Sequence, residues 1–232
     1  MTTMDEQGPI EDGEWAPALE AHVVDAGPPP RVHGYDVWND LARNYGFAEV
    51  VLLSLRGVAP TAAEGRAFDL ALTLLAPASI AEAPAHTTAL LRMMAAPPAN
   101  TVGVGAMSLA QQAQALVEAH ASWFAWLANP IGEPPNEFLA RTPEDRTCVA
   151  AVRAVVDADL SPVLARIEPT ADATALALLV ACGVRSAHQV IGTIVLARLA
   201  LVVAEADRHV VSGLRHYPIE LPAFDYEEDE RG

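Results

Sequence analysis

The stretch Gly34–Glu64, GYDVWNDLARNYGFAEVVLLSLRGVAPTAAE, decides the fold class of this chain. It begins with a Gly-Tyr-Asp turn, continues through a short helical segment and an apolar helical segment from Phe47 to Leu55, and ends in a turn from Gly57 to Pro60. Apolar residues that recur every three or four positions are typical of a helix with one buried face. Glycine and proline then end that helix. The stretch therefore predicts two helices joined by a tight turn.

The same periodicity recurs along most of the chain, whereas strand patterns are scarce. Prolines and glycines separate the helical segments. Within the fifth predicted helix, Pro162 is expected to kink or split the segment. The predicted helices span residues 47–55, 62–75, 87–96, 107–127, 145–167, 171–181 and 186–209. The sequence thus predicts an all-α protein of about eight to ten helices.

The composition excludes several functions. A hydrophobic fraction of 52% is ample for a continuous core. The 14 basic residues are all arginine, and 30 acidic residues give the chain a formal charge of −16. Without lysine, the chain cannot form a lysine Schiff base or use a Walker-type phosphate lysine. The negative charge repels nucleic acid and anionic membrane surfaces, so neither is expected as a partner.

No metal site and no tightly bound cofactor is expected. Cys148 and Cys182 lie in apolar segments without CxxC spacing, and no histidines have ligand spacing. Both cysteines are therefore predicted to be buried and reduced. The amino-terminal residues lack the regions of a secretory signal, so we expect a cytoplasmic protein. The apolar stretch Val190–Ala206 contains Arg198 and is expected to be a core helix rather than a membrane span.

Acidic segments are predicted at both ends of the chain. Residues 1–30 show little periodicity and close with three prolines, which favour extended backbone over helix. They are expected to form an acidic N-terminal tail. Residues 225–232 form a charge run and are expected to be a solvated C-terminal tail.

The opening stretch resembles the amino-terminal part of citrate synthases. In that family a Gly-Tyr-Asp segment precedes a helix pair of the pattern sFeEvayLLl-G-lPt-e-e. The matching residues here are Phe47, Glu49, Val50, Leu52, Leu53, Gly57, Pro60, Thr61 and Glu64. From about Arg31 to Tyr217, the chain resembles a short, divergent member of the citrate synthase and citryl-CoA lyase superfamily.

This resemblance implies a large helical domain interrupted by a small helical lobe, with the active site in the cleft between them. The proline-rich stretch Asn129–Pro143 marks the first boundary. By resemblance, the large domain comprises residues 31–128 and 188–224, and the small lobe comprises residues 129–187. Family members are typically homodimers, so the resemblance also implies a dimer that uses helices 87–96 and 107–127.

The segment Glu168–Val184, EPTADATALALLVACGV, resembles the family segment whose aspartate removes a proton from the methyl group of an acyl-CoA thioester. Asp172 falls on that aspartate, and Gly183 falls on a family glycine. A carboxylate can act as such a base only when it is partly desolvated beside an acidified carbon acid. An aspartate at the start of an apolar helix can equally be an N-cap. Both roles are open for Asp172.

The segment Ile194–Ala206, IVLARLALVVAEA, resembles the family helix whose arginine binds a carboxylate of the substrate acid. Arg198 matches that arginine. A guanidinium in so apolar a helix needs a buried anion or several carbonyl groups, and a neighbouring Asp or Glu is the structural alternative. Leu201 and Glu205 replace a family glycine and a histidine or glutamine, which changes the implied acid pocket. Arg215 matches, with an offset, a carboxylate-binding arginine that reaches the neighbouring subunit.

The segment Asn100–Leu116 resembles a family loop in which a histidine stabilises the developing enolate. Met107 falls on that histidine, so the catalytic position is degenerate. A thioether cannot donate a hydrogen bond, and the loss of such a donor removes about 3 to 4 kcal/mol of transition-state stabilisation. A second family histidine polarises the acceptor ketone, yet the sequence has no histidine between His120 and His188.

Two main functions follow from the resemblance. The first is a citrate synthase-like protein with an altered active site, which binds a carboxylic acid or acyl-CoA ligand without ordinary citrate synthase turnover. Such a protein could be the silent subunit beside an active paralog. The alternative is an active acyl-CoA-dependent enzyme, either carbon-carbon bond-forming or citryl-CoA lyase-like, in which Asp172 is the base or nucleophile and Arg198 holds a carboxylate. A third possibility is a protein that only interacts through its helical dimer surface.

Overall fold

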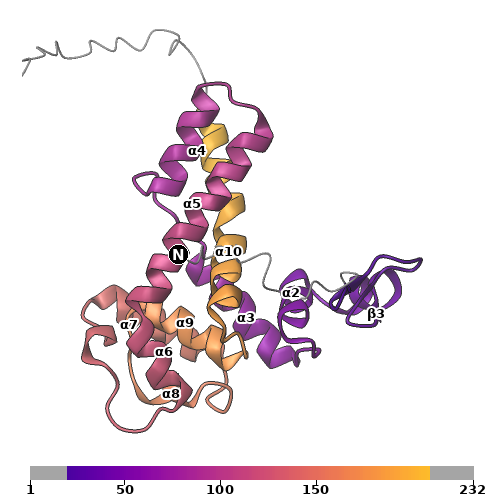
Figure 1. The fold of residues 1–232 in the computed structure, drawn as a ribbon. Helices are drawn as coiled ribbons and strands as arrows, with labels where there is room; N and C mark the ends of the chain where they lie inside the picture. The colour runs from indigo at the N-terminus through magenta and orange to yellow at the C-terminus, as the bar shows by residue number, and fades with distance from the viewer. Residues whose placement is uncertain (1–19, 210–232) are drawn as a thin grey trace, which may run out of the picture. The chain divides into compact units, whose positions relative to one another are not determined.

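The computed structural model describes residues 20–209, and these are predominantly helical (Figure 1). The helices are α1 (Ala42–Asn44), α2 (Phe47–Arg56), α3 (Ala62–Leu75), α4 (Ala83–Met93), α5 (Pro98–Ala119), α6 (Ala121–Ala128), α7 (Pro143–Arg153), α8 (Pro162–Arg166), α9 (Ala171–Ala181) and α10 (Ala187–Arg208). This confirms the predicted all-α class. The chain divides into two compact units, one that ends at Gly65 and one that begins at Arg66.

The first unit contains a small antiparallel sheet that the sequence did not reveal. Its strands are β1 (Val24–Asp25), β2 (Arg31–Val32) and β3 (Tyr35–Asp36), paired in the order β1-β2-β3. A turn with positive φ at His33 and Gly34 joins the last two strands. Strands of two residues are too short to show an alternating pattern. β1 lies within the residues expected to form an acidic tail.

The helix pair predicted from the opening stretch is present: α2 lies in the first unit, and α3 begins there. Glu49 caps the start of α2, because the Gly46 N–H donates to its Oε2 at 2.7 Å. Gly57 ends α2 with φ of 75°, a conformation that glycine adopts without strain. Near the start of α3, a Cβ on Gly65 would lie 2.7 Å from Cγ of Glu49, so only glycine permits this approach of α3 to α2.

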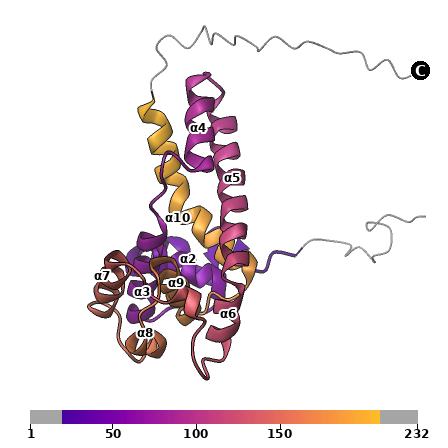
Figure 2. The ribbon, with the colours of Figure 1, turned by 90° about the vertical axis from the view of Figure 1, so that its left-hand side faces the viewer.

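In the second unit, α4, α5 and α10 lie side by side as a helical bundle (Figures 1 and 2). Ala85, Leu109 and Val202, one from each helix, are buried together. A Cβ on Gly105 of α5 would lie 2.8 Å from Oγ1 of Thr88 in α4. Small residues at such contacts let helix axes approach closely. The bundle therefore depends on small residues as well as on apolar ones.

In another part of the second unit, α6, α7 and α8 pack against α9. This helix is buried over almost its whole length, as expected for a helix that is apolar on every side. In α6, Trp123 is fully buried and its Nε1–H donates to the Ala173 carbonyl at 3.0 Å. Its ring stacks on Trp126 with 5.2 Å between centroids. An indole in this position joins α6 to the first turn of α9.

Several helix boundaries differ from the sequence prediction, and α4 spans Ala83–Met93 where residues 87–96 were predicted. α5 begins at Pro98 rather than Met107, since proline is well tolerated in the first turn of a helix. The run then breaks at His120, where α6 begins. The expected fifth helix is split into α7 and α8, and Pro162 is the first residue of α8. The predicted effect of Pro162 is therefore confirmed.

α10 is long and apolar enough, by length and composition, to cross a membrane. Its contacts with α4 and α5 are those of a bundle helix, although only 22% of its most apolar window is buried within the chain. Cys182 is buried as predicted, whereas Cys148 is only half-buried, and the two do not form a disulfide. Among residues 20–209, no group of three or more His, Cys, Asp or Glu side chains could hold a metal ion.

Candidate functional site

Arg198 lies in the middle of α10, and its side chain is only 13% exposed. Its Nε–H donates to the carbonyl of Leu75 at the end of α3, at 2.7 Å. One terminal nitrogen, Nη1, donates to Oε1 of Gln112 in α5 at 2.9 Å. The same nitrogen lies 3.6 Å from Oε2 of Glu82, immediately before α4. The guanidinium thus joins four segments of the second unit.

Glu82 is held in place by further hydrogen bonds. Its Oε1 accepts from the backbone N–H of Ser79 at 2.8 Å, and its Oε2 accepts from the side-chain amide of Gln112. Partial burial raises the pKa of the Glu82 carboxyl, but the bonds from Ser79 and Gln112 and the charge of Arg198 outweigh it. The net pKa is lowered, so Glu82 is ionised at neutral pH.

The Arg198, Gln112 and Glu82 side chains form a closed polar triangle in the bundle. Gln112 accepts from Arg198 with its carbonyl oxygen and donates to Glu82 with its amide nitrogen. A guanidinium within an apolar helix was expected to find an anion or a carbonyl group. This chain supplies both, through Glu82 and Leu75. Arg198 therefore already holds a carboxylate in the structure.

Asp172 is an exposed residue in the first turn of α9. The N-cap of that helix is Thr170, whose Oγ1 accepts from the Ala173 N–H at 3.4 Å, so Asp172 is not the cap. An acidic residue in the first turn still interacts favourably with the helix dipole. Burial raises the pKa of the Cys148 thiol, and the charges of Asp145 and Asp172 raise it further. Asp172 thus belongs to the contact region of α7 and α9.

The structure shows no direct contact between the two residues proposed to share a site. Among residues 20–209, no hydrogen bond or ion pair joins Asp172 to Arg198. The partners of Arg198 come from α3, α5 and the segment before α4, whereas Asp172 lies near α7. Arg215, the third predicted binding residue, lies outside the described residues.

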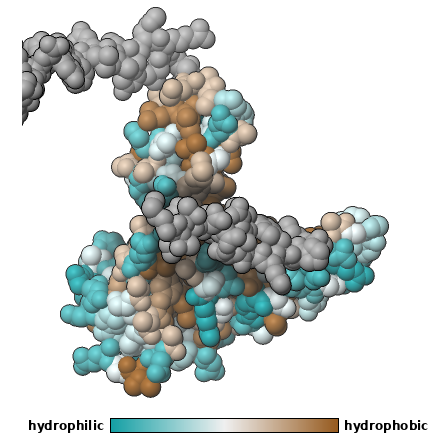
Figure 3. Space-filling view, in the orientation of Figure 1, coloured by the Kyte–Doolittle hydropathy of each residue, from teal (hydrophilic) through white to brown (hydrophobic). Residues whose placement is uncertain are grey.

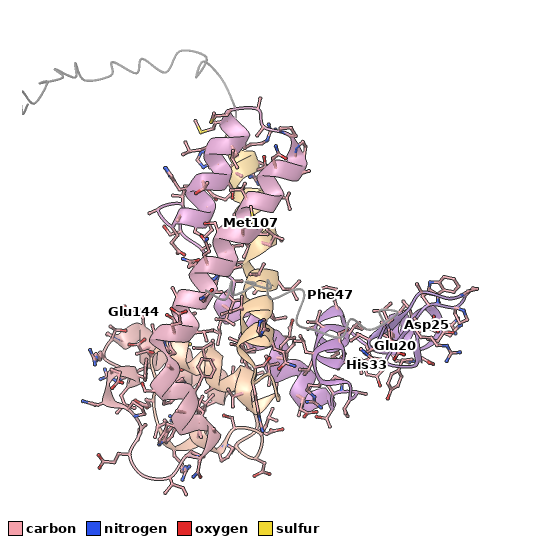
Figure 4. The ribbon with its side chains drawn as sticks, in the orientation of Figure 1. Glu20, Asp25, His33, Phe47, Met107 and Glu144 are labelled. Atoms are coloured by element: carbon pink, nitrogen blue, oxygen red, sulfur yellow. The ribbon has the colours of Figure 1, made fainter. Side chains whose placement is uncertain are left out.

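Met107 lies in the middle of α5 rather than in a loop, and it is 63% exposed (Figure 4). Leu109, two residues further on, is fully buried in the bundle. His120 lies at the break between α5 and α6, where it is the C-cap of α5. It is buried, stacks on Phe138 with 4.7 Å between centroids, and has Nδ1 2.9 Å from the Leu116 carbonyl oxygen. The sequence favours a surface or cap position for this residue, and the structure shows a buried cap.

Two surface hollows carry arginines whose guanidinium groups are already paired. One, of about 360 Å³, lies where α4 and α10 end and α5 begins, and there Arg92 donates to Asp207 at 3.0 Å. Another, of about 250 Å³, lies between α7 and α8. Its Arg153 donates to the carbonyl groups of Leu164 at 2.7 Å and Ile167 at 3.0 Å. These arginines stabilise the folded chain through these bonds.

The fold is similar to that of two solved proteins. Citryl-CoA lyase from Hydrogenobacter thermophilus superposes with a TM-score of 0.61 and 15% identity, over 92% of this chain and 96% of that one. ATP citrate lyase from Methanothrix soehngenii, solved in complex with citrate and coenzyme A, gives a TM-score of 0.58 and 13% identity. That match covers 94% of this chain but only 43% of the other.

No protein-family model and no curated protein sequence matches this chain. The structural likeness therefore shows the fold, because both identities are low. It agrees with the helical fold expected from the opening stretch. The chain has the citrate synthase-like helical fold seen in citryl-CoA lyase and ATP citrate lyase.

Proposed function

We propose that this chain is a citrate synthase-like protein with an altered active site, which binds a carboxylic acid or acyl-CoA ligand without ordinary citrate synthase turnover. The observation that carries the proposal is the environment of Arg198. Its guanidinium is largely buried in the bundle and is placed beside a carboxylate, that of Glu82. A ligand carboxylate would exchange with Glu82 for the same nitrogen atoms.

The absence of ordinary turnover is supported by the state of the other two positions. Met107 presents a thioether to solvent where the resemblance implies a hydrogen-bond donor. Asp172 is exposed, and an aspartate that is not desolvated is too weak a base to remove a proton from a thioester methyl group. The geometry therefore favours ligand binding over the alternative of an active enzyme.

The ligand class is supported by the fold. ATP citrate lyase was solved with citrate and coenzyme A. Citrate has several carboxylates, and coenzyme A carries acyl groups on its thiol. By analogy of fold, a polycarboxylate or an acyl-CoA is the class that we propose for this chain. Acyl-CoA would be a dissociable ligand rather than a tightly bound cofactor.

We also propose that the chain forms a homodimer in the cytoplasm, or pairs with an active paralog. Large apolar side chains are exposed on the bundle (Figure 3). They are Leu90, Met94, Val102, Met107, Leu196 and Leu201. Most of α10 also remains unburied by its own chain. Exposed apolar surface of this kind is typical of protein interfaces.

The proposal is tested by titrating citrate and acetyl-CoA into the protein by calorimetry, together with an assay for thiol release from acetyl-CoA and oxaloacetate. We expect saturable binding and no thiol release. Glu82→Gln keeps the side-chain shape but removes the competing charge, so a ligand that uses Arg198 should bind about tenfold more tightly. The matched control, Glu144→Gln, changes an exposed carboxylate on α7 and should leave affinity unchanged (Figure 4).

Two results would refute the proposal. Thiol release that disappears in Asp172→Asn would show an active enzyme, in which Asp172 is the base or nucleophile. If neither citrate nor acetyl-CoA bound to the wild type or to Glu82→Gln, the remaining possibility would be a protein that only interacts through its helical dimer surface.

A further inference from the structure

Two neighbouring hollows share two residues, Phe124 and Arg185. The larger, of about 350 Å³, lies where α5 ends and where α6 and α10 begin, and its apolar walls include Val117 and Val190. The smaller, of about 170 Å³, is lined by residues of α6 and the end of α9. Because Phe124 and Arg185 border both, the hollows are adjacent, and together they are called here the Arg185 recess.

Arg185 stands at the edge of this recess on the link between α9 and α10. Its backbone N–H donates to Oε1 of Gln189 at 3.3 Å, within the capping box that starts α10. Gly183, with φ of 86°, turns the chain after α9. The backbone on both sides of Arg185 is thus fixed by local structure. The positively charged Arg185 is therefore anchored at the edge of the recess.

The guanidinium of Arg185 differs from others in the second unit. Arg92, Arg153 and Arg198 each donate to a carboxylate or to carbonyl groups. Within residues 20–209, the Arg185 side chain makes no hydrogen bond or ion pair, and the residue is exposed. A guanidinium presents a planar fork of donors that fits a carboxylate. Arg185 therefore has no anionic partner among the described residues and is available to bind one.

The lining of the recess limits which anion can bind. The hydrophobic walls require an apolar body, and a single guanidinium matches a single carboxylate. Glu118 also lines the larger hollow and repels anions, so a ligand with several negative charges is disfavoured more strongly than one with a single charge. The volume of the larger hollow is at the lower end of the ~300–1,000 Å³ typical of small-molecule sites.

We propose that the Arg185 recess binds an amphipathic monocarboxylate, with its carboxylate on Arg185 and its aliphatic chain against Phe124, Val117 and Val190. This site shares no residue with the Arg198 triangle and does not depend on the proposed function. No covalent bond forms or breaks at this site. The ligand is held by one charge-assisted pair and by burial of its apolar chain.

The test uses octanoate as the probe in isothermal titration calorimetry with the full chain. We expect one saturable site, and octanamide, which keeps the chain but lacks the charge, should bind at least about tenfold more weakly. Arg185→Gln should weaken octanoate by a similar factor. Arg141→Gln, which changes an exposed arginine outside the recess, is the matched control and should have no effect.

A second variant tests the recess independently of charge. Ala121 is exposed and lines the larger hollow, so Ala121→Phe should fill it without disturbing the core and should abolish octanoate binding. Equal affinity for octanoate and octanamide would overturn the proposal, as would unchanged binding in both variants or no binding by the wild type. Glu82→Gln should leave octanoate affinity unchanged, which separates this site from the Arg198 triangle.

Discussion

Replacing Arg198 with methionine tests whether the polar triangle stabilises the bundle. Methionine keeps much of the apolar stem of arginine, so packing along α10 changes little. The substitution removes the donor to the carbonyl of Leu75, a residue that is 1% exposed. A buried acceptor left without a donor costs about 1 to 3 kcal/mol. The Glu82 side chain is 33% exposed and can regain water, so it adds little.

The expected destabilisation is therefore about 1 to 3 kcal/mol, measured as the free energy of unfolding in urea. In a chain of this size it corresponds to a fall in Tm of about 2 to 12 °C. Arg92→Met is the control, because Arg92 and Asp207 form an exposed pair on the same bundle with 48% and 63% of their side chains exposed. Such pairs contribute about 0 to 1 kcal/mol. If the two variants lost equal stability, the triangle would have no special structural role.

Three further outcomes follow from the structure. The pKa values of Glu64 and Glu82 are lowered from 4.5 in the folded protein, so the stability that their ionised forms contribute should be complete above about pH 4.5 and should decline as the pH falls further. Urea unfolding at pH 3 to 7 would show this loss of stability, and the loss should be smaller in Glu82→Gln. Gly105→Ala should destabilise the bundle by about 1 to 3 kcal/mol, because the new Cβ would meet the buried Thr88. Gly192→Ala should instead stabilise α10 by up to about 1 kcal/mol, because its new Cβ would have no neighbouring atom within 4 Å. Trp123→Phe should lower the free energy of unfolding by about 1 to 2 kcal/mol through loss of the bond to the Ala173 carbonyl, and unchanged thermal unfolding would contradict that role.

Local sequence patterns predicted most of the helices because the signals lie within a few residues of one another. The start of α5 was missed because Pro98 was interpreted as a breaker, although proline favours the first turn of a helix. The small sheet was missed because its register depends on pairing between strands of two residues. The pattern of such short strands is indistinguishable from that of a loop.

The candidate site was only partly accessible from the sequence. A guanidinium in the apolar α10 was expected to need a polar partner, and it has several. Its partners, Glu82 and Gln112, are distant in sequence and were not foreseen, since no local pattern brings α4 and α5 onto α10. The predicted convergence of Asp172 with Arg198 came from the family resemblance and from the spacing of the two residues along the chain, and it stays a prediction. Spacing along a chain does not fix which faces of two helices meet.

The stacked indoles of α6 give this protein a built-in optical probe. Trp123 and Trp126 are both in the α6 to α9 group, and the bundle formed by α4, α5 and α10 contains no tryptophan. The other two tryptophans, Trp15 and Trp38, precede the second unit. In a variant with both of them replaced by phenylalanine, near-ultraviolet emission will follow the tertiary order around α9, whereas far-ultraviolet dichroism sums over every helix. Coincident transitions by the two methods would mean that the two halves of the second unit melt as one cooperative body.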